Sequence, residues 1–440
     1  MKPMTNAYYT KLFALINIIY RKIFHEEVSI EVEKFIKNIS YVGIGTIVAS
    51  IFSFSYNILA GRWLGPSEYG TFTLIQSVAM FLYIPMLLGF HTAMVKYNAE
   101  KIDFPRQRCI VSTTYILVVL FTTVSILIYY IFSKELATIF SISDEGFYFA
   151  VLFAVVFVFY TLTTETLRSL HMIRDFARLK PLISGILFFT FLVLALMCSD
   201  LSFKSPLLSM LLAYGITGGV ILVIIRKYLR PELNGKWVRK LHRYSVYSLM
   251  GGISFVFYTN IDKLLIKRYL SATDVGAYSA YHYSFTSIIM LLITIFVTVF
   301  FPIASQSSNK WPLFQKVNKL ALSIIILSFP LILISGNIIL HLYGTEYTFD
   351  LYLAILFTLL AIVVAVNQAY GQLMASIGEK GIKIMSLAAI SMAIINVSAN
   401  IMLIPIWGLN GAVISTIISY IISTGIILSR KSYFKDYKAL

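Results

Sequence analysis

Charged residues are scarce in this chain of 440 residues. Asp, Glu, Lys and Arg together make up 13% of it, whereas hydrophobic residues make up 58% and the mean hydropathy is +0.82. A soluble domain carries about 25% charged residues, so this supply cannot cover a water-exposed surface. The composition therefore excludes a soluble globular protein and predicts a chain embedded in a lipid bilayer.

Cysteines and catalytic motifs are also nearly absent. The two cysteines, Cys109 and Cys198, fall at opposite membrane faces in the topology given below, so no disulfide is expected between them. His25 and Glu26 begin like a zinc-protease helix, but Ser29 stands where the second histidine is needed. The sequence contains no phosphate-binding loop and no nucleophile elbow. We therefore expect no catalytic residues, no metal and no cofactor.

Long apolar stretches, in contrast, fill most of the chain. A helix needs about 20 predominantly apolar residues to cross the hydrocarbon core, and twelve stretches meet this requirement. They lie at 39–61, 70–93, 109–132, 147–166, 181–199, 205–226, 244–267, 277–301, 318–342, 349–372, 382–404 and 410–429. Of the 36 Lys and Arg residues, 30 lie at the termini or in the even-numbered connections and 6 in the odd-numbered ones. Because basic residues concentrate on the cytoplasmic side, both termini are predicted to be cytoplasmic.

The formal net charge of +16 belongs to the same pattern. The basic residues are spread between apolar stretches rather than gathered on one folded face, which excludes nucleic acid as a partner. The first 38 residues mix apolar and basic positions, as in LFALINIIYRKIF. This segment is predicted to be an interfacial helix that membrane lipids hold at the inner leaflet.

One eleven-residue pattern occurs twice, 206 positions apart. RWLGPSEYGTF at 62–72 and RYLSATDVGAY at 268–278 share Arg, Leu and Gly, and four further positions carry similar residues. Each copy joins two spans on the predicted outer face, and six spans separate the copies, so the two halves have the same orientation. We therefore predict an all-α integral membrane protein with twelve transmembrane helices in two parallel six-helix repeats around a central cavity.

The repeated sequence also predicts local structure. Gly65 is expected to break the helix, Ser67 or Thr273 to cap the helix that follows, and Gly70 and Gly276 to permit close packing. The chain then divides into an amphipathic interfacial segment, an N-terminal lobe, a basic cytoplasmic linker, a C-terminal lobe and a cytoplasmic tail. These parts are 1–38, 39–226, 227–243, 244–429 and 430–440.

Polar side chains inside the spans are costly in hydrocarbon and are site candidates for that reason. The clearest group lies in TNIDKLLIKRYL, where Asn260 and Lys263 share one helical face and Asp262 points sideways. The repeat places Asn57 at the position of Lys263, so both lobes are polar at this level. One interpretation is a cationic cavity wall, with Asp262 and Lys263 facing an anionic ligand. The alternative for Lys263, and the favoured one for residues 267–268, is that the cation snorkels to the interface.

A second polar group lies at the predicted inner end of the fourth span. Glu165, Arg168, His171 and Arg174 follow one another at spacings of three and are predicted to form a stripe along one helical side. The stripe could guide a charged headgroup into the cavity, and Glu165, which lies deepest, is the candidate to carry a proton or a sodium ion. An ordinary basic inner connection is the preferred interpretation for three neighbours, Arg174, Arg178 and Lys180.

Two histidines complete the candidates. His91, at the end of the second span, points to the same inner mouth. His282 stands among Tyr278, Tyr281 and Tyr283, whose rings could stack on sugars, although a tyrosine belt at the membrane interface is the commoner explanation.

The chain contains the stretches AGRWLGPSEYGTFTLIQS, GFHTAMVKY, FFPIAS and INVSANIMLIPIWGLNGAVISTIISYI. Together they resemble bacterial polysaccharide flippases, the polysaccharide-transport branch of the multidrug/oligosaccharidyl-lipid/polysaccharide superfamily. AGRWLGPSEYGTFTLIQS resembles their opening hairpin, GFHTAMVKY the end of their second span and FFPIAS the end of their eighth. INVSANIMLIPIWGLNGAVISTIISYI, residues 395–421, is similar to their eleventh-to-twelfth hairpin. These diffuse patterns run in the expected order from residue 39 to 425.

The resemblance implies a specific function. Such proteins move an undecaprenyl-diphosphate-linked oligosaccharide from the inner to the outer leaflet of the bacterial cytoplasmic membrane by alternating access, for O-antigen, capsule or related polysaccharides. The sugar and diphosphate would occupy the cavity, the lipid tail would stay outside, and a polymerase and chain-length machinery would act downstream. Relatives often carry cavity arginines, whereas this chain has few arginines deep in its spans. A lysine is a point charge and binds a diphosphate with less defined geometry than the bidentate guanidinium of an arginine.

Two alternatives stay open at this point. A multidrug-type cation antiporter of the same superfamily would need acidic cavity walls, and the lysines beside Asp262 argue against it. A membrane glycan polymerase or ligase would need a large outer loop, and the longest predicted one is short, 133–146. The sequence identifies neither the glycan nor the driving force.

Overall fold

The computed structural model of the chain describes residues 30–197, 200–306 and 309–435. Within these ranges the regular elements are all helices and no strand occurs, in agreement with the all-α prediction. Most of the predicted interfacial segment, residues 1–29, lies outside the described residues. Its last part belongs to the first described helix, α2, which begins at Ile30.

The helices follow one another with short connections. They are α2 (Ile30–Leu87), α3 (Phe90–Ala99), α4 (Phe104–Ile131), α5 (Ser133–Phe140), α6 (Asp144–Ser169), α7 (Ile173–Met197), α8 (Lys204–Ile225), the 3-10 helix η1 (Arg226–Tyr228), α9 (Gly235–Tyr269), α10 (Ala272–Gln306), α11 (Trp311–Leu342), α12 (Leu351–Ala375), α13 (Glu379–Ser429) and α14 (Ser432–Lys435). Several begin at a polar cap: Asp350, for example, accepts hydrogen bonds from the first amides of α12.

Two of these helices are each a pair joined at a glycine kink. Gly65 in α2 has φ 70° and ψ 170°, and Gly408 in α13 has φ 57° and ψ −134°. Glycine adopts a positive φ without a steric penalty, and Pro66 adds a break because proline has no amide hydrogen. The predicted break at Gly65 is confirmed, and α2 and α13 each contain two of the predicted apolar stretches.

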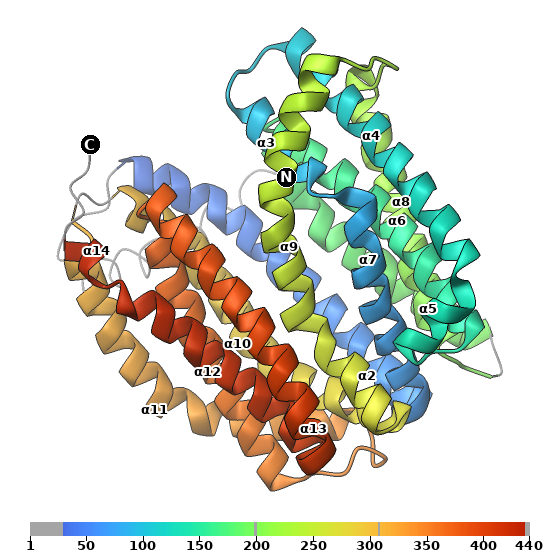
Figure 1. The fold of residues 1–440 in the computed structure, drawn as a ribbon. Coiled ribbons are helices and arrows are strands. Elements are labelled where there is room, and N and C mark those ends of the chain that lie inside the picture. Colours follow the sequence, from blue (N-terminus) through green and yellow to red (C-terminus); the bar gives the residue numbers. More distant parts are fainter. Residues whose placement is uncertain (1–29, 198–199, 307–308, 436–440) are drawn as a thin grey trace, which may run out of the picture.

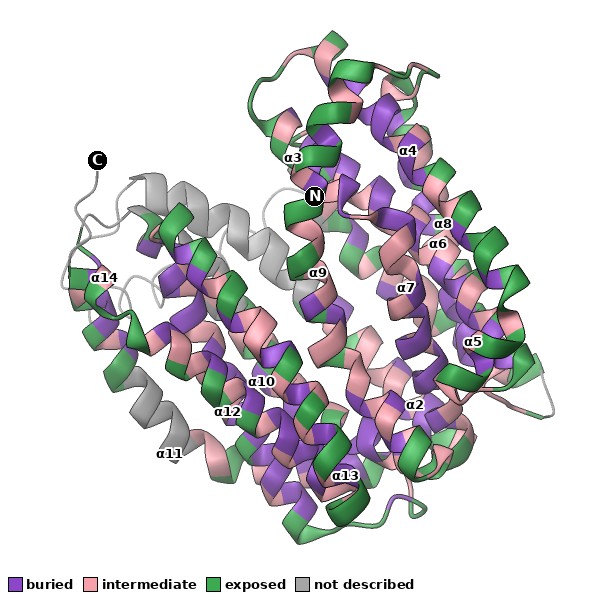
Figure 2. Cartoon of the chain, viewed as in Figure 1, coloured by how far each residue is buried: buried purple, intermediate pink, exposed green. Residues whose placement is uncertain are grey.

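Eight helices in the described part of the chain are long and apolar enough to cross a membrane. Large hydrophobic side chains, such as Leu127, Ile338 and Met402, are exposed on the outside of the helices, where Figure 2 shows much of the surface as exposed. So many exposed hydrophobic side chains are unfavourable in water, but they form the expected surface of a protein in lipid. The chain is therefore a multi-pass membrane protein, while the total of twelve spans stays a prediction.

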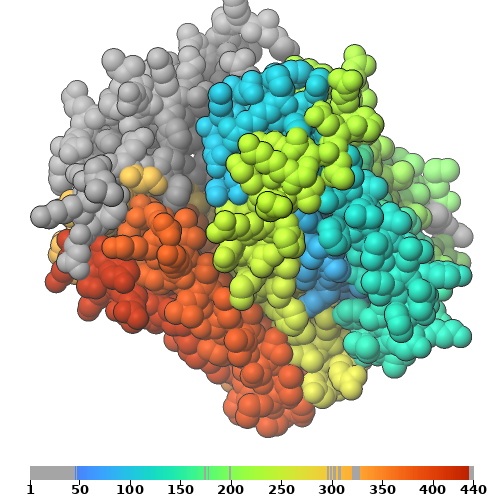
Figure 3. Space-filling model, turned by 45° about the horizontal axis from the view of Figure 1, so that its top comes forward, coloured from blue at the N-terminus to red at the C-terminus, as the bar shows by residue number. Residues whose placement is uncertain are grey.

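Figure 1 shows the helices in two groups. Helices α4, α6, α7 and α8 pack together with α2 on one side, and α10 to α13 pack together on the other. Because α2 also packs extensively against α10 and against α9, it forms the main junction between the groups. In the space-filling view, the yellow-green α9 lies between the cyan and green helices and the orange to red ones (Figure 3).

The two copies of the repeated sequence lie directly against each other. The hydroxyl oxygens of Thr73 and Ser279, two positions separated by the repeat offset, are 2.9 Å apart. Gly70 and Gly276, separated by the same offset, pack backbone to backbone. A Cβ added to Gly70 would lie 1.8 Å from a carbonyl oxygen of the other copy, and one added to Gly276 would lie 1.9 Å from one. The predicted close packing at both glycines is confirmed, and we call these four residues the repeat contact.

The capping prediction is wrong in the second copy. Ser271, two residues before Thr273, caps α10: its Oγ accepts a hydrogen bond from the Asp274 amide at 3.1 Å, and the Asp274 carboxylate accepts one from the Ser271 amide at 3.1 Å. This reciprocal pair is a capping box closed by an aspartate. In the first copy the matching acid, Glu68, instead accepts a hydrogen bond from the Phe203 amide at 2.8 Å and so joins α2 to the start of α8.

The second predicted span also ends earlier than expected. Helix α2 stops at Leu87, because Leu88 and Gly89 have φ values of 43° and 77°, and α3 begins at Phe90. His91 therefore lies on a separate short helix.

Candidate functional site

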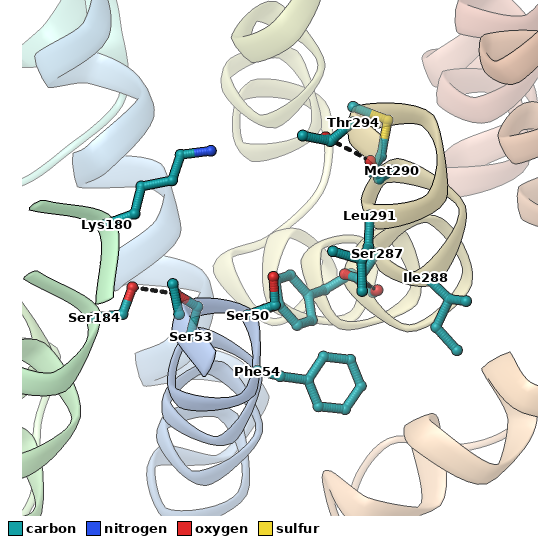
Figure 4. Close-up of a pocket in the computed structure, with 12 residues that line it drawn as sticks. Ser50, Ser53, Phe54, Lys180, Ser184, Ser287, Ile288, Met290, Leu291 and Thr294 are labelled. Carbon is teal, nitrogen blue, oxygen red and sulfur yellow. Dashed lines mark hydrogen bonds between the residues drawn. The ribbon is translucent and has the colours of Figure 1, made fainter. Parts of the chain in front are cut away.

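A pocket of about 380 Å³ lies between the two groups of helices (Figure 4). Its walls come from α2, α7 and α10. The lining residues are Ala49, Ser50, Ser53, Phe54, Lys180, Ser184, Tyr283, Ser287, Ile288, Met290, Leu291 and Thr294. Within this lining, Lys180 is the only charged side chain, and five hydroxyl-bearing Ser and Thr residues contribute the small polar groups. The described walls are therefore mainly apolar, with one cation, several hydroxyls and no acid.

Helices α2 and α10, which form two walls of the pocket, also carry the repeat contact farther along. The Asn57 amide donates a hydrogen bond to the Ser53 carbonyl oxygen at 2.8 Å, so Asn57 lies one helical turn beyond the pocket wall. The Phe54 and Tyr283 rings meet across the groups with centroids 5.7 Å apart. Asn57 thus lies close to the junction of the two groups.

Lys263 and His282 lie near each other on α9 and α10, and the charge of Lys263 acts on the imidazole. Lys263 is half-buried and His282 is exposed, so neither is sealed within helix packing. The His282 ring is stacked on the Tyr278 ring at 6.2 Å between centroids. Asn260 is half-buried one turn away, with its amide on the Val256 carbonyl oxygen at 3.1 Å. None of the three residues Lys263, His282 and Asn260 belongs to the lining of the pocket between α2, α7 and α10.

The tyrosines around His282 do not form an interfacial belt. Tyr278 and Tyr281 are only 3% and 2% exposed. The Tyr281 hydroxyl donates to the Thr348 carbonyl oxygen at 2.8 Å, and it accepts a hydrogen bond from the Asp350 amide at 2.6 Å. Both rings therefore serve packing within the C-terminal helices.

Asp262 lies elsewhere than predicted. It is 5% exposed and its carboxylate accepts three hydrogen bonds, from the Tyr278 hydroxyl at 2.7 Å, the Asn400 amide at 2.6 Å and the Thr416 hydroxyl at 2.9 Å. These partners stand on α10 and α13, so the carboxylate is enclosed by the C-terminal helices. The prediction that Asp262 faces the cavity beside Lys263 is wrong in this structure. One residue of helical rotation, about 100°, separates the two directions.

Two buried amide side chains near Asp262 have oxygen atoms that accept no hydrogen bond from the described residues. The Asn396 amide nitrogen donates to the Thr416 hydroxyl at 3.2 Å. The side-chain carbonyl oxygens of Asn396 and Asn400 are buried and have no hydrogen-bond partner among the described residues. These polar side chains form a buried set around the carboxylate, and an intramembrane acid in such surroundings is a candidate to bind a proton or a small cation. Sequence analysis missed this set because its members are distributed over α9 and both halves of α13.

Glu165, Arg168 and His91 do come together, on α6 and α3. The Glu165 carboxylate lies 2.6 Å from the Arg168 guanidinium, and the charge of Arg168 also acts on His91. The longer stripe is wrong: α6 ends at Ser169, His171 has a φ of 56°, and Arg174 belongs to α7. Glu165 already has a cation as its partner, which makes it a weaker ion carrier than Asp262. None of these three residues lines the pocket between the two groups of helices, called the inter-lobe pocket below.

Two groups of membrane helices with a lysine-bearing pocket between them, and a buried acid inside one group, form an architecture that suits a membrane transporter. The family model described as "Polysaccharide biosynthesis protein" matches residues 35–308, which is more than half of the chain. The chain belongs to this family, and the resemblance found in the sequence is confirmed.

Known proteins agree with this assignment. The "Probable low-salt glycan biosynthesis flippase Agl15" of Haloferax volcanii is 27% identical over 196 residues, an alignment that spans 43% of this chain and 41% of the relative. Among solved structures, an inward-facing multidrug resistance MATE family transporter of the MOP superfamily matches with a TM-score of 0.70 and 15% identity, over 90% of this chain and all of that one. The lipid II flippase MurJ in an inward closed conformation matches with a TM-score of 0.62 and 15% identity, over 89% and 87%. These relatives are flippases and transporters, which confirms that the family is not one of enzymes.

Proposed function

We propose that this protein is a flippase that moves an undecaprenyl-diphosphate-linked oligosaccharide from the inner to the outer leaflet of the bacterial cytoplasmic membrane. The observation that carries the proposal is the cationic pocket between the two groups of helices, in a chain of a polysaccharide biosynthesis family. The product would be a repeat unit of O-antigen, capsule or a related polysaccharide, which a polymerase and chain-length machinery would then use. We propose twelve transmembrane helices in two lobes, with both termini cytoplasmic.

The position of the repeat contact supports a mechanism of alternating access. The repeat contact joins α2 and α10 at one end, and the pocket lies farther along the same helices. A cavity closed at the outer end and open towards the inner end is the state that would receive a substrate from the inner leaflet. The likeness to an inward-facing transporter supports this assignment of the state.

The ion that drives the cycle would bind at Asp262 rather than at Glu165. Asp262 is a carboxylate without a cationic partner among the described residues, enclosed within the helices that carry Lys263 and His282. A sodium ion or a proton at Asp262 would change the packing of α9, α10 and α13, and hence the position of the cavity wall. No cofactor is needed in this scheme.

The cation antiporter is the weaker alternative. Its cargo would need acidic groups in the cavity, whereas the described lining of the pocket contains Lys180 and no acid. Asp262 is enclosed away from the pocket and cannot meet a large organic cation there.

A deletion strain tests the proposed function directly. We expect completed lipid-linked repeat units to accumulate on the cytoplasmic face, and the restored gene to clear them. The measurement is the amount and sidedness of undecaprenyl-diphosphate-linked glycan in membrane extracts. Normal units together with new sensitivity to cationic drugs would support the antiporter instead, and unpolymerised units on the outer face would support a polymerase.

The Lys263→Gln variant tests the cavity wall. We expect surface polysaccharide in the complemented strain to form about 10- to 150-fold more slowly, because one charged contact to a diphosphate contributes about 1.5–3 kcal/mol. Lys267→Gln, one turn farther along α9, is the matched control and should complement fully. Equal activity of both variants at equal protein levels would show that Lys263 only snorkels.

A further inference from the structure

Lys180 lies in the wall of the inter-lobe pocket, although its sequence position fits an ordinary basic connection. It stands near the start of α7, and Figure 4 shows its side chain extending beside Ser184 and across from Thr294. Among the described residues it has no carboxylate partner. Its neighbour Arg178, in contrast, lies 3.8 Å from the Asp175 carboxylate and does not line the pocket. A cation without a counter-ion at the wall of a pocket can accept an anion from outside the protein.

Hydroxyl groups from two helices line the same pocket as Lys180 (Figure 4). Ser53 on α2 and Ser184 on α7 are hydrogen-bonded to each other at 3.0 Å, and either can donate. Ser50 lies one turn from Ser53 along α2 and belongs to the same wall. Hydroxyls beside a lysine are suitable donors for the several oxygens of a phosphate group.

The opposite part of the pocket is apolar. Phe54 from α2 and Ile288, Met290 and Leu291 from α10 form this wall. Lys180 lies just inside the apolar span Arg178–Met197, which is the level at which lipid phosphates meet the hydrocarbon core. A soluble anion would make no contact with the apolar wall. An anionic lipid has a charged headgroup for Lys180 and an apolar chain for this wall.

We propose that Lys180 and the adjacent hydroxyls of Ser53 and Ser184 bind the phosphate of a phosphorylated isoprenoid lipid, with the first part of its chain against Phe54 and Leu291. The site is separate from the Lys263 and His282 pair, and it would hold the headgroup at the entrance before the glycan moves deeper. The choice of an isoprenoid lipid rests on the proposed function. The new element is the place at which this lipid first binds.

The test uses the full chain in nanodiscs of phosphatidylcholine, with geranylgeranyl diphosphate as the probe. We expect Lys180→Gln to raise the Kd about tenfold through loss of one charged contact, and Lys180→Arg to retain binding. Arg178→Gln, two residues away on the same helix and equal in its charge change, should bind like the unchanged protein. Inorganic diphosphate should bind much more weakly than the isoprenoid probe, because it lacks the apolar part.

Three outcomes would overturn the proposal. Equal Kd values for Lys180→Gln and the unchanged protein would remove Lys180 from the site. An equal loss in Arg178→Gln would indicate a general charge effect of the membrane surface. Inorganic diphosphate binding as tightly as the isoprenoid probe would indicate a site for free anions. The probe carries no glycan, so binding can be positive even if the deletion strain shows no trapped repeat units; the two failures are therefore distinguishable.

Discussion

Gly276→Leu should abolish transport by keeping the two copies of the repeated sequence apart. Even a Cβ at this position would lie 1.9 Å from a backbone carbonyl oxygen of the facing copy, and a leucine side chain is far larger. Backbone cannot yield as a flexible side chain can, so α2 and α10 must separate. An overpacked contact costs about 1–3 kcal/mol, which corresponds to a shift of about 5- to 150-fold in the ratio of closed to open states.

Thiol labelling measures this shift. Ser279 is 6% exposed in the closed contact, so a cysteine at 279, in a chain lacking Cys109 and Cys198, should react slowly with a membrane-impermeant reagent applied from outside. Adding Gly276→Leu should make it react faster and should remove complementation of the deletion strain. Gly185→Leu is the control, since a Cβ there meets nothing within 4 Å. Slow labelling and full complementation by Gly276→Leu would show that this contact is not a gate.

Asp262→Asn should uncouple the protein from its driving ion. The Tyr278 hydroxyl, the Asn400 amide and the Thr416 hydroxyl all donate to the carboxylate, so an amide nitrogen introduced there would face donors and lower stability by about 1–3 kcal/mol. The lost negative charge also removes the attraction for a cation. We expect ion-driven flipping to fall by about 5- to 150-fold, the range of a coupling free energy of 1–3 kcal/mol.

Thermal unfolding separates the loss of ion binding from the loss of stability. In the unchanged protein the Tm should rise as sodium replaces choline at constant ionic strength, because an ion that binds only the folded state stabilises it. A Tm that responds to pH and not to sodium would identify the proton instead. Asp262→Asn should lower the Tm and remove the response, whereas Glu165→Gln should keep it. If Glu165→Gln removed the response and Asp262→Asn kept it, Glu165 would be the residue that binds the driving ion.

The sequence was sufficient for the features that depend on local order. Apolar runs predicted the membrane helices, Gly65 and Pro66 predicted the kink, and the repeat predicted the close packing at Gly70 and Gly276. Each of these depends on backbone preferences or on composition within a few turns, which are visible in a single sequence.

Features that depend on helix rotation were not predictable in this way. Asp262 and Lys263 are neighbours in sequence, yet one is enclosed by the C-terminal helices and the other is not, because the tertiary packing fixes the rotation of α9. Lys180 appeared to be one of many basic residues at an inner connection, and only the approach of α10 places it in a pocket wall. The oxygen set around Asp262 likewise requires two distant halves of α13 to meet α9.

The repeat contact has an evolutionary consequence. Positions separated by the repeat offset lie against each other, Thr73 with Ser279 and Gly70 with Gly276, as equivalent residues do on the axis of a two-fold symmetric dimer. A six-helix ancestor could have formed the same contact with a second copy of itself, and in that dimer any substitution would have altered both sides at once. Joining two such copies in one chain, as the predicted repeat implies, would remove this restriction. One half could then acquire Lys263 while the other kept Asn57, so that the two walls of a single cavity became chemically different.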